Sequence, residues 1–299
     1  MVQKKIIKFF ENICKNILNI EKIVLYYERP NNFGTFLEDF VRKVAIITGA
    51  SSGIGKATKE FLREKGIVVY NISLNAKEDE FTYSANVNDY EKVKTIFEDI
   101  FKKEGQIDFL VNNAGYGIAG AIENTSTQNI NNLFATNLSS VVALSSMAIP
   151  YLKKTKGRIV NISSVAGVIP LPFQACYSAA KAGVLNFSKA LNNEVKPFGM
   201  RVIAVMPGDT KTGFTKARVV DEAKDNSYAE RDAKSIAKMA KDEQKGKDPK
   251  TVAKVIYKVL TKKKPPIQKT VGFSYKLIVL LAKCLPEGLV SWIVKKIYG

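Results

Sequence analysis

Hydrophobic residues between 41 and 213 occur mainly as short uninterrupted runs, separated by longer helical segments. The runs are VAIIT (44–48), IVVYNI (67–72), FLVN (109–112), RIVNIS (158–163) and RVIAVM (201–206). Continuous β-branched runs, rather than alternating ones, are typical of strands buried on both faces of a parallel sheet. The segments between them are long enough for right-handed crossover helices. The pattern predicts a doubly wound α/β fold, with a ligand beyond the carboxyl ends of the strands.

The N-terminal segment, 1–34, has a different pattern. Apolar residues recur at steps of three and four: Ile6, Phe10, Ile13, Ile17, Ile20, Val24 and Tyr27. This spacing predicts an amphipathic helical extension, which the breakers Pro30, Asn31, Asn32 and Gly34 end. Charges interrupt every apolar run, so the segment is not a secretory signal. The helix either packs on the protein's own body or a partner subunit, or lies on a membrane surface.

The main domain is expected to span 41–272, followed by a second extension at 273–299. Within it, 213–248 is polar and rich in Lys, Asp and Ala, and is either a mobile lid or a solvated surface segment. A helix is predicted at 249–262 and an edge strand at 267–272. The final extension is apolar and basic, but Lys283, Pro286 and Glu287 interrupt it. It contains no run of the ~18–20 apolar residues that a membrane-spanning helix needs.

Composition narrows the available chemistry. The sequence has no histidine, which excludes mechanisms built on Ser-His-Asp or Cys-His and removes the commonest zinc ligand, so no metal site is expected. The cysteines, Cys14, Cys176 and Cys284, are far apart. This argues against a disulfide framework and suits the reducing cytoplasm. Acid–base chemistry must therefore use Tyr, Lys, Asp, Glu or Cys.

The formal net charge of +18 raises the question of an anionic partner. Much of this charge comes from lysines in 245–299, where the acidic residues are Asp248 and Glu287. Lysine greatly outnumbers arginine, and no arginine cluster with interleaved aromatics suits base recognition. A nucleic-acid partner is therefore not expected.

A glycine-rich turn, TGASSGIG (48–55), follows the first predicted strand and precedes a helical pattern. Glycines at 49, 53 and 55 let the backbone turn tightly and approach a pyrophosphate. The helix that starts near Gly53 would point free N–H groups at the anion. The strand–turn–helix context predicts a dinucleotide site.

Several further motifs accompany this turn. They are NNAG at 112–115, Tyr177-x-x-x-Lys181, Asn137 and Ser164 upstream, and PGDTKTGF at 207–214. In order and spacing the chain resembles the short-chain dehydrogenase/reductase family over 41–272, with its Asn-Ser-Tyr-Lys tetrad. The resemblance implies a Rossmann-type domain that interconverts a carbonyl and an alcohol using NAD(P).

The proposed catalytic chemistry starts from Tyr177. A free tyrosine has a pKa of ~10, and a nearby ammonium favours the phenolate, so Lys181 one helical turn away is expected to lower that pKa. Ser164 can hydrogen-bond the substrate oxygen. By the resemblance, Lys181 also holds the nicotinamide ribose, and Asn137 holds a water that relays protons. Alternatively, Asn137 only satisfies backbone groups in a helix kink.

Two neighbours of these residues have less specific interpretations. Strand alternation places Ser163 and Ser164 on opposite faces, and the spacing to Tyr177 favours Ser164. Cys176 is expected to pack or, at most, to contribute to the pocket wall.

The resemblance and the motifs together give a set of cofactor-binding candidates. Asn86 departs from the family, which often has Asp there to contact adenine. The full set is Thr48, Gly49, Ser51, Ser52, Gly53, Ile54, Gly55, Ser73, Asn86, Val87, Asn113, Ala114, Gly115, Tyr177, Lys181, Pro207, Gly208, Thr210 and Thr212.

NADP is favoured over NAD. An acidic residue at the end of the second strand would bind the ribose 2′-hydroxyl and repel a 2′-phosphate, and Ser73 occupies that position. Ser52, Asn75, Lys56 and Lys77 could accommodate a phosphate. The arginine that usually accompanies NADP is absent.

The substrate is expected to be a lipophilic ketone or alcohol, such as a steroid-like or acyl compound. The segment 165–171, residues near Phe173 and the lid would wall the pocket, and SVAGVIPLPF is apolar. A 3-oxoacyl-thioester reductase is the alternative enzyme, and a non-catalytic cofactor-binding or membrane-surface protein is the alternative from another class. The resemblance implies a homo-oligomer. We expect a cytoplasmic protein that contacts membranes peripherally through its termini.

Overall fold

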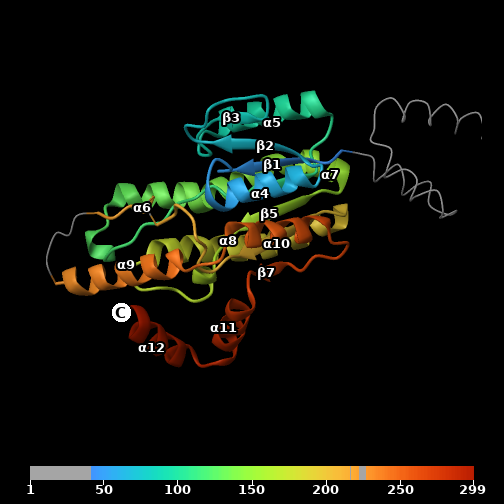
Figure 1. Cartoon of the computed structure of the whole chain (residues 1–299). Helices are drawn as coiled ribbons and strands as arrows, with labels where there is room; N and C mark the ends of the chain where they lie inside the picture. Colours follow the sequence, from blue (N-terminus) through green and yellow to red (C-terminus); the bar gives the residue numbers. More distant parts are fainter. Residues whose placement is uncertain (1–41, 216, 222–226) are drawn as a thin grey trace, which may run out of the picture. The chain divides into compact units, whose positions relative to one another are not determined.

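The computed structural model describes residues 42–215, 217–221 and 227–299, so the predicted helical extension at 1–34 lies outside the described residues. Residues Lys43–Gly299 form one compact unit. Its centre is a seven-stranded parallel sheet in the order β3-β2-β1-β4-β5-β6-β7 (Figure 1). The predicted doubly wound α/β architecture is confirmed.

The strands lie close to the apolar runs. Their bounds are β1 Val44–Thr48, β2 Val68–Ser73, β3 Thr82–Ser84, β4 Phe109–Asn112, β5 Arg158–Ile162, β6 Arg201–Met206 and β7 Gln268–Thr270. Five strands match the five predicted runs to within one residue, and β7 matches the predicted edge strand. The short strand β3 was not predicted.

Helices connect and cover the strands (Figure 1). The α-helices are α4 Gly53–Glu64, α5 Tyr90–Glu104, α6 Thr127–Phe134, α7 Ser140–Thr155, α8 Ala175–Val195, α9 Ala229–Gln244, α10 Pro249–Thr261, α11 Phe273–Cys284 and α12 Glu287–Tyr298. A π-helical turn, η2 Ala135–Ser139, joins α6 to α7, and the 3-10 turns are η1 Ile122–Asn124, η3 Val165–Gly167 and η4 Lys196–Phe198.

Alternation along β1 separates two hydrophobic cores. Val44 and Ile46 belong to the core that α5, α7 and α8 cover, whereas Ala45 and Ile47 belong to the core that α4 and α10 cover. All four side chains are at most 1% exposed. Burial of both faces of the strand explains why its sequence is apolar without alternation.

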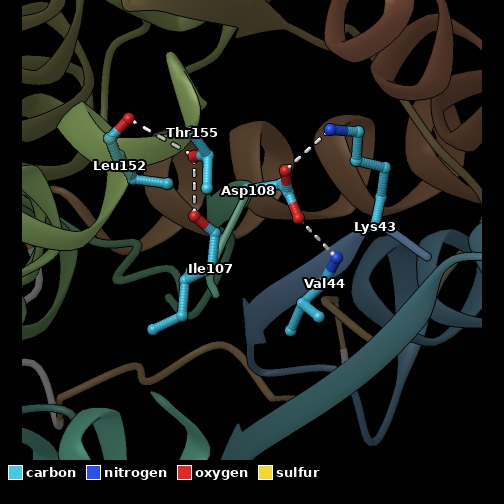
Figure 2. Close-up of polar contacts among 6 residues, drawn as sticks. All are labelled: Lys43, Val44, Ile107, Asp108, Leu152 and Thr155. Atoms are coloured by element: carbon cyan, nitrogen blue, oxygen red, sulfur yellow. Dashed lines mark hydrogen bonds and ion pairs between the residues drawn. The ribbon is translucent and has the colours of Figure 1, made fainter. Parts of the chain in front are cut away.

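The amino ends of β1 and β4 are joined by the buried carboxylate of Asp108 (Figure 2). Asp108 accepts a hydrogen bond from the Val44 N–H at 2.9 Å and an ion pair from Lys43 Nζ at 3.0 Å. Beside it, the Thr155 hydroxyl at the end of α7 donates to the Ile107 carbonyl at 2.9 Å. These contacts fix the edge of the sheet opposite the carboxyl ends, which are left free to form a site.

One helical run, Thr127–Thr155, is long and apolar enough to span a membrane by length and composition. Its second part, α7, buries Leu144, Ala148 and Leu152 in the core shared with α5. Helices in the core of a globular domain have this composition too, and the packing of α7 accounts for it here.

Candidate active site

The glycine-rich turn joins β1 to α4 in a conformation that needs glycine. Gly49 and Gly53 have φ values of +69° and +53°, which side-chain-bearing residues rarely adopt. At Gly55, a Cβ atom would lie 2.3 Å from the Gly49 carbonyl oxygen. The turn is therefore tight because these positions carry no side chain.

Side chains from neighbouring strands hold this turn. Asn71 on β2 is buried, and its Oδ1 accepts from the Ala50 N–H at 2.9 Å. The Thr48 hydroxyl accepts from the backbone N–H groups of Asn113 and Ala114, both at 3.0 Å. Asn71 was not predicted as a site residue, although a polar residue inside an apolar strand run was a usable signal.

The start of α4 suits an anionic group. Its N-cap, Ser52, makes no side-chain capping bond, and the first turn carries no acidic residue. The first N–H groups of a helix have no intrahelical partner, and the dipole favours negative charge there. Together with the glycine turn, this geometry fits the pyrophosphate of a dinucleotide cofactor.

Tyr177 and Lys181 lie one turn apart on α8, as predicted. Lys181 is buried, and its Nζ donates to the Ile162 carbonyl at the end of β5 at 2.8 Å. That nitrogen lies 5.7 Å from the centre of the Tyr177 ring. The Tyr177 side chain also hydrogen-bonds to Ser164, which follows β5. The structure thus brings three of the four predicted catalytic side chains together.

The predicted lowering of the Tyr177 pKa does not occur in this structure. Burial raises the pKa of Tyr177 to about 12, which outweighs the lowering by the Ser164 hydrogen bond. Burial also lowers the pKa of Lys181 to about 8. The ammonium points at the Ile162 carbonyl rather than at the phenol, which is the physical reason for the difference. The phenol is therefore a proton donor at neutral pH.

Asn137 lies in the π-helical turn between α6 and α7 and is fully buried. Its amide donates to the Tyr116 carbonyl at 2.7 Å and accepts from the Tyr116 N–H at 3.1 Å. A Cβ on Gly115 would lie 3.0 Å from Asn137 Oδ1 and 3.7 Å from Lys181 Nζ. Asn137 therefore satisfies backbone groups at a helix irregularity and lies beside Lys181, so its two proposed roles are geometrically compatible.

A single cavity of about 1170 Å³ joins the glycine turn to the catalytic residues. Of the predicted site residues, Thr48, Gly55 and Asn137 lie behind its wall. The others line it: Gly49, Ser51, Ser52, Gly53, Ile54, Ser73, Asn86, Val87, Asn113, Ala114, Gly115, Ser164, Tyr177, Lys181, Pro207, Gly208, Thr210 and Thr212.

The second strand ends at this cavity without a carboxylate. Ser73 is buried, and its hydroxyl donates to Asn71 Oδ1 at 2.7 Å. Ser52 also lines the cavity, whereas Lys56 borders a separate hollow. The lining carboxylates are Asp209 and Glu243, and neither belongs to β2.

The substrate side of the cavity has an apolar wall. Val165, Ala166, Ile169 and Leu171 line it as predicted, together with Phe214 from the lid segment. The Phe214 ring packs edge-on against Tyr177, with the ring centres 5.6 Å apart. Of the residues near Phe173, Gln174 lines the cavity, as predicted. The Phe173 ring itself lies under the Arg231 guanidinium, with 5.8 Å between the ring centre and the guanidinium carbon.

A buried ion pair connects the two parts of the lid segment. The Arg218 guanidinium pairs with the Glu243 carboxylate of α9, and the Thr215 hydroxyl donates to the same carboxylate. The Arg218 side chain is 2% exposed. This pair fixes Phe214 and its neighbours over Tyr177, so the described part of the lid forms an ordered wall of the site.

Cys176 packs beside Ile118 and Ala180, away from the cavity lining.

The C-terminal helices form the remaining wall, which was not predicted from the sequence. Side chains of α11 and α12, among them Ile278, Leu281, Val290 and Ile293, line the cavity. Tyr275 of α11 packs its ring where a Cβ on Gly208 would lie, 2.4 Å away. The extension 273–299 thus belongs to the site.

Comparisons with known proteins agree with this geometry. The family model described as short chain dehydrogenase matches residues 43–223. The chain is 35% identical over 264 residues to the 3-ketodihydrosphingosine reductase of Bacteroides thetaiotaomicron, covering 86% of this chain and 98% of that protein. It is 37% identical over 186 residues to a 3-oxoacyl-(acyl-carrier-protein) reductase of Vibrio cholerae, covering 58% of this chain and 76% of that protein.

A solved structure is also similar. The short-chain dehydrogenase from Streptomyces avermitilis superposes with a TM-score of 0.74 at 29% identity, covering 84% of this chain and 96% of that one. The fold is therefore that of this group of proteins.

Proposed function

This chain belongs to the short-chain dehydrogenase/reductase family and is an NAD(P)-dependent oxidoreductase, and on that premise we propose that it reduces the ketone of a long-chain lipid with NADPH. The observation that carries the proposal is the cavity itself. It runs from the glycine turn past Tyr177 to an apolar wall made by α11 and α12. An apolar wall in the same cavity as the proton donor suits an alkyl chain attached to a ketone.

The extent of similarity supports a long-chain keto substrate. The match to 3-ketodihydrosphingosine reductase covers 86% of this chain, whereas the match to the Vibrio reductase covers 58%. 3-Ketodihydrosphingosine is a long-chain ketone with an amino group on the carbon beside the carbonyl.

The residues of this chain divide the reduction between them. When bound, the nicotinamide cofactor supplies the hydride to the carbonyl carbon. Ser164 and Tyr177 hydrogen-bond the carbonyl oxygen, and the Tyr177 phenol gives its proton to that oxygen as the alcohol forms. A pKa of about 12 keeps this phenol protonated at neutral pH, so it carries the proton that the reduction requires.

Lys181 and Asn137 complete the proton chemistry. We assign Lys181, whose Nζ lies 5.7 Å from the centre of the Tyr177 ring, the role of returning a proton to the phenolate left on Tyr177. Asn137 fixes the Tyr116 backbone beside Lys181. We assign Asn137 the role of holding the path by which solvent protons reach Lys181.

NADPH is the proposed reductant because β2 ends without a carboxylate. An acidic side chain there would repel a 2′-phosphate, and Ser73 and Ser52 carry hydroxyl groups instead.

The second candidate is reduction of a 3-oxoacyl thioester. The 37% identity to the 3-oxoacyl-(acyl-carrier-protein) reductase of Vibrio cholerae over the matched region favours it. Against it stands the apolar wall of α11 and α12, because a thioester carried on a large acyl carrier needs access for its polar arm.

A substrate panel with NADPH and NADH in parallel tests the proposal. The compounds are 3-ketodihydrosphingosine, a long-chain ketone without the amine, a short ketone and a long-chain 3-oxoacyl thioester. We expect the highest kcat/KM for 3-ketodihydrosphingosine with NADPH, followed by the long-chain ketone. A higher kcat/KM for the thioester would favour the second candidate, and a higher kcat/KM with NADH would contradict the cofactor assignment.

A further inference from the structure

The C-terminal helices expose a large number of apolar side chains. Phe273 is 81% exposed, Leu280 57% and Trp292 57%. In α12 no side chain is buried, and in α11 only Val279 is. Contiguous apolar surface of this kind on a folded protein marks an interaction site.

The two helices have two adjoining apolar faces. One face lines the cavity and includes Ile278, Leu281, Ile293 and Ile297. The second, which we call the outer face, consists of Phe273, Leu277 and Leu280 on α11 and Leu289 and Trp292 on α12.

The outer face follows helical spacing, with steps of four and three along α11 and three along α12. None of its five residues lines the cavity. The substrate site therefore does not explain the outer face.

Lysines accompany this apolar surface. Lys276, Lys283, Lys295 and Lys296 are all exposed, and Glu287 is the acidic residue of 273–299. The Lys296 ammonium lies 5.9 Å from the centre of the Trp292 ring. Aromatic and aliphatic side chains with lysines beside them are the pattern of helices that lie in the headgroup region of an anionic bilayer.

The helix pair is attached to the catalytic domain by specific polar contacts. Besides the Tyr275 contacts with the segment after β6, the Tyr298 hydroxyl of α12 donates to Asp242 of α9 at 3.1 Å. The Lys238 ammonium of α9 lies 5.3 Å from the centre of the Tyr298 ring. These contacts hold the cavity-lining face in place and leave the outer face without a partner among the described residues.

We propose that the outer face docks on an anionic lipid bilayer, so that the cavity opens beside the membrane that holds its lipid substrate. The docking surface itself stands on the exposed apolar and basic side chains. The nature of the molecule that enters rests on the proposed function.

A second copy of this chain fits the outer face less well. Symmetric dimers bring the same patch of both subunits together. Such an interface would place Lys276, Lys283, Lys295 and Lys296 near their own copies, with Glu287 as the local acidic residue. An anionic surface instead compensates this charge.

The test uses Trp292, because it is the single tryptophan of the sequence. The full-length protein is mixed with vesicles of phosphatidylcholine alone, or of phosphatidylcholine with phosphatidylglycerol. Binding is measured by co-sedimentation and by tryptophan emission. We expect binding and a blue shift on the anionic vesicles, weaker binding on the neutral ones, and weakening by added salt.

The variant is the double substitution Leu280→Glu and Leu289→Glu, which leaves Trp292 and the cavity lining unchanged. We expect its partition coefficient on anionic vesicles to fall at least ~tenfold, because charged side chains replace apolar ones at the bilayer. The matched control is Phe198→Glu. Phe198 is 49% exposed beside the amino end of β6, and this substitution is expected to change nothing.

Three outcomes would overturn the proposal. The first is that the wild-type protein binds no vesicles, and the second is that the double variant binds as well as the wild type. The third is that the double substitution changes only the oligomeric state in solution. No turnover is needed for these readouts. A protein that docks but does not reduce lipid ketones therefore refutes the proposed function and leaves the docking surface intact.

Discussion

The Tyr275 hydroxyl of α11 donates a hydrogen bond to the Asp209 carboxylate and accepts one from the Asp209 N–H at 3.1 Å. Asp209 belongs to the segment after β6, next to Gly208, which lines the cavity. The reciprocal pair therefore connects the C-terminal extension to the backbone beside Gly208, one of the predicted cofactor-binding residues.

Tyr275→Phe tests this connection. It keeps the ring against Gly208 and removes both hydrogen bonds, one of them to a carboxylate. Hydrogen bonds to charged groups contribute about 1.5–3 kcal/mol, so we expect the free energy of unfolding to fall by about 2 kcal/mol. The KM for the cofactor is expected to rise. Denaturant unfolding and steady-state kinetics measure the two effects.

The control is Tyr257→Phe, which removes a hydroxyl from α10, where the Tyr257 ring packs edge-on against Phe61. It is expected to leave the KM for the cofactor unchanged. Equal effects of the two substitutions on that KM would contradict a specific role for Tyr275.

The sequence predicted the elements whose signal is local. β1, β4 and β6 have the predicted bounds because uninterrupted apolar runs report burial on both faces. The glycine turn and the pair Tyr177 and Lys181 were also predictable, since a loop between strand and helix and a spacing of one helical turn are fixed by nearby residues.

The parts that were missed depend on distant contacts. The three residues of β3 are too few to produce a periodic pattern, and they form a strand because β2 offers a free edge. Nothing in the sequence near Tyr275 points to Asp209, which is 66 residues away. The pKa of Tyr177 depends on how deeply the fold buries the phenol. Residue spacing alone therefore predicted a lowered pKa, whereas burial raises it.

Gly55→Ala is expected to impair cofactor binding. The new Cβ would lie 2.3 Å from the Gly49 carbonyl oxygen and 2.5 Å from Asn113 Nδ2, so the turn must shift. We expect the affinity for NADPH to fall by at least about tenfold, since a shift of the turn moves the N–H groups away from the pyrophosphate. Isothermal titration measures this loss directly. Gly288→Ala, at a position with open space around it, is the control and should bind NADPH as the wild type does.

Tyr177→Phe removes the proton donor and keeps the ring that packs against Phe214. Loss of a general acid typically costs about 10²–10⁴-fold in rate, and we expect kcat to fall by that amount. NADPH affinity should stay within about twofold, because the ribose contacts assigned to Lys181 remain. Retention of more than about a tenth of wild-type kcat would refute Tyr177 as the acid.

The pH dependence of ketone reduction is expected to follow Lys181. Its pKa is lowered to about 8 by burial, so the side chain is charged below that pH and neutral above it. The pKa of Tyr177, about 12, keeps the phenol protonated throughout this range. The reductive kcat/KM should therefore be level near neutral pH and fall above about pH 8.

Lys181→Arg distinguishes the titration of Lys181 from other causes of the fall in kcat/KM above about pH 8. The guanidinium stays charged to far higher pH, so whatever activity the variant retains should no longer decline near pH 8. An unchanged decline in the variant would show that another group is responsible.

Ala282→Phe is expected to discriminate between substrates by chain length. Ala282 of α11 lines the cavity, and the added ring would occupy space on its apolar wall. We expect kcat/KM for a long-chain ketone to fall at least about tenfold, which corresponds to about 1.4 kcal/mol, while a short ketone is reduced at the wild-type rate. The control is Ser274→Phe. Ser274 lies in the first turn of the same helix, is exposed and does not line the cavity. Equal losses for long and short ketones in Ala282→Phe would mean that α11 supports the fold of the site without contacting the alkyl chain.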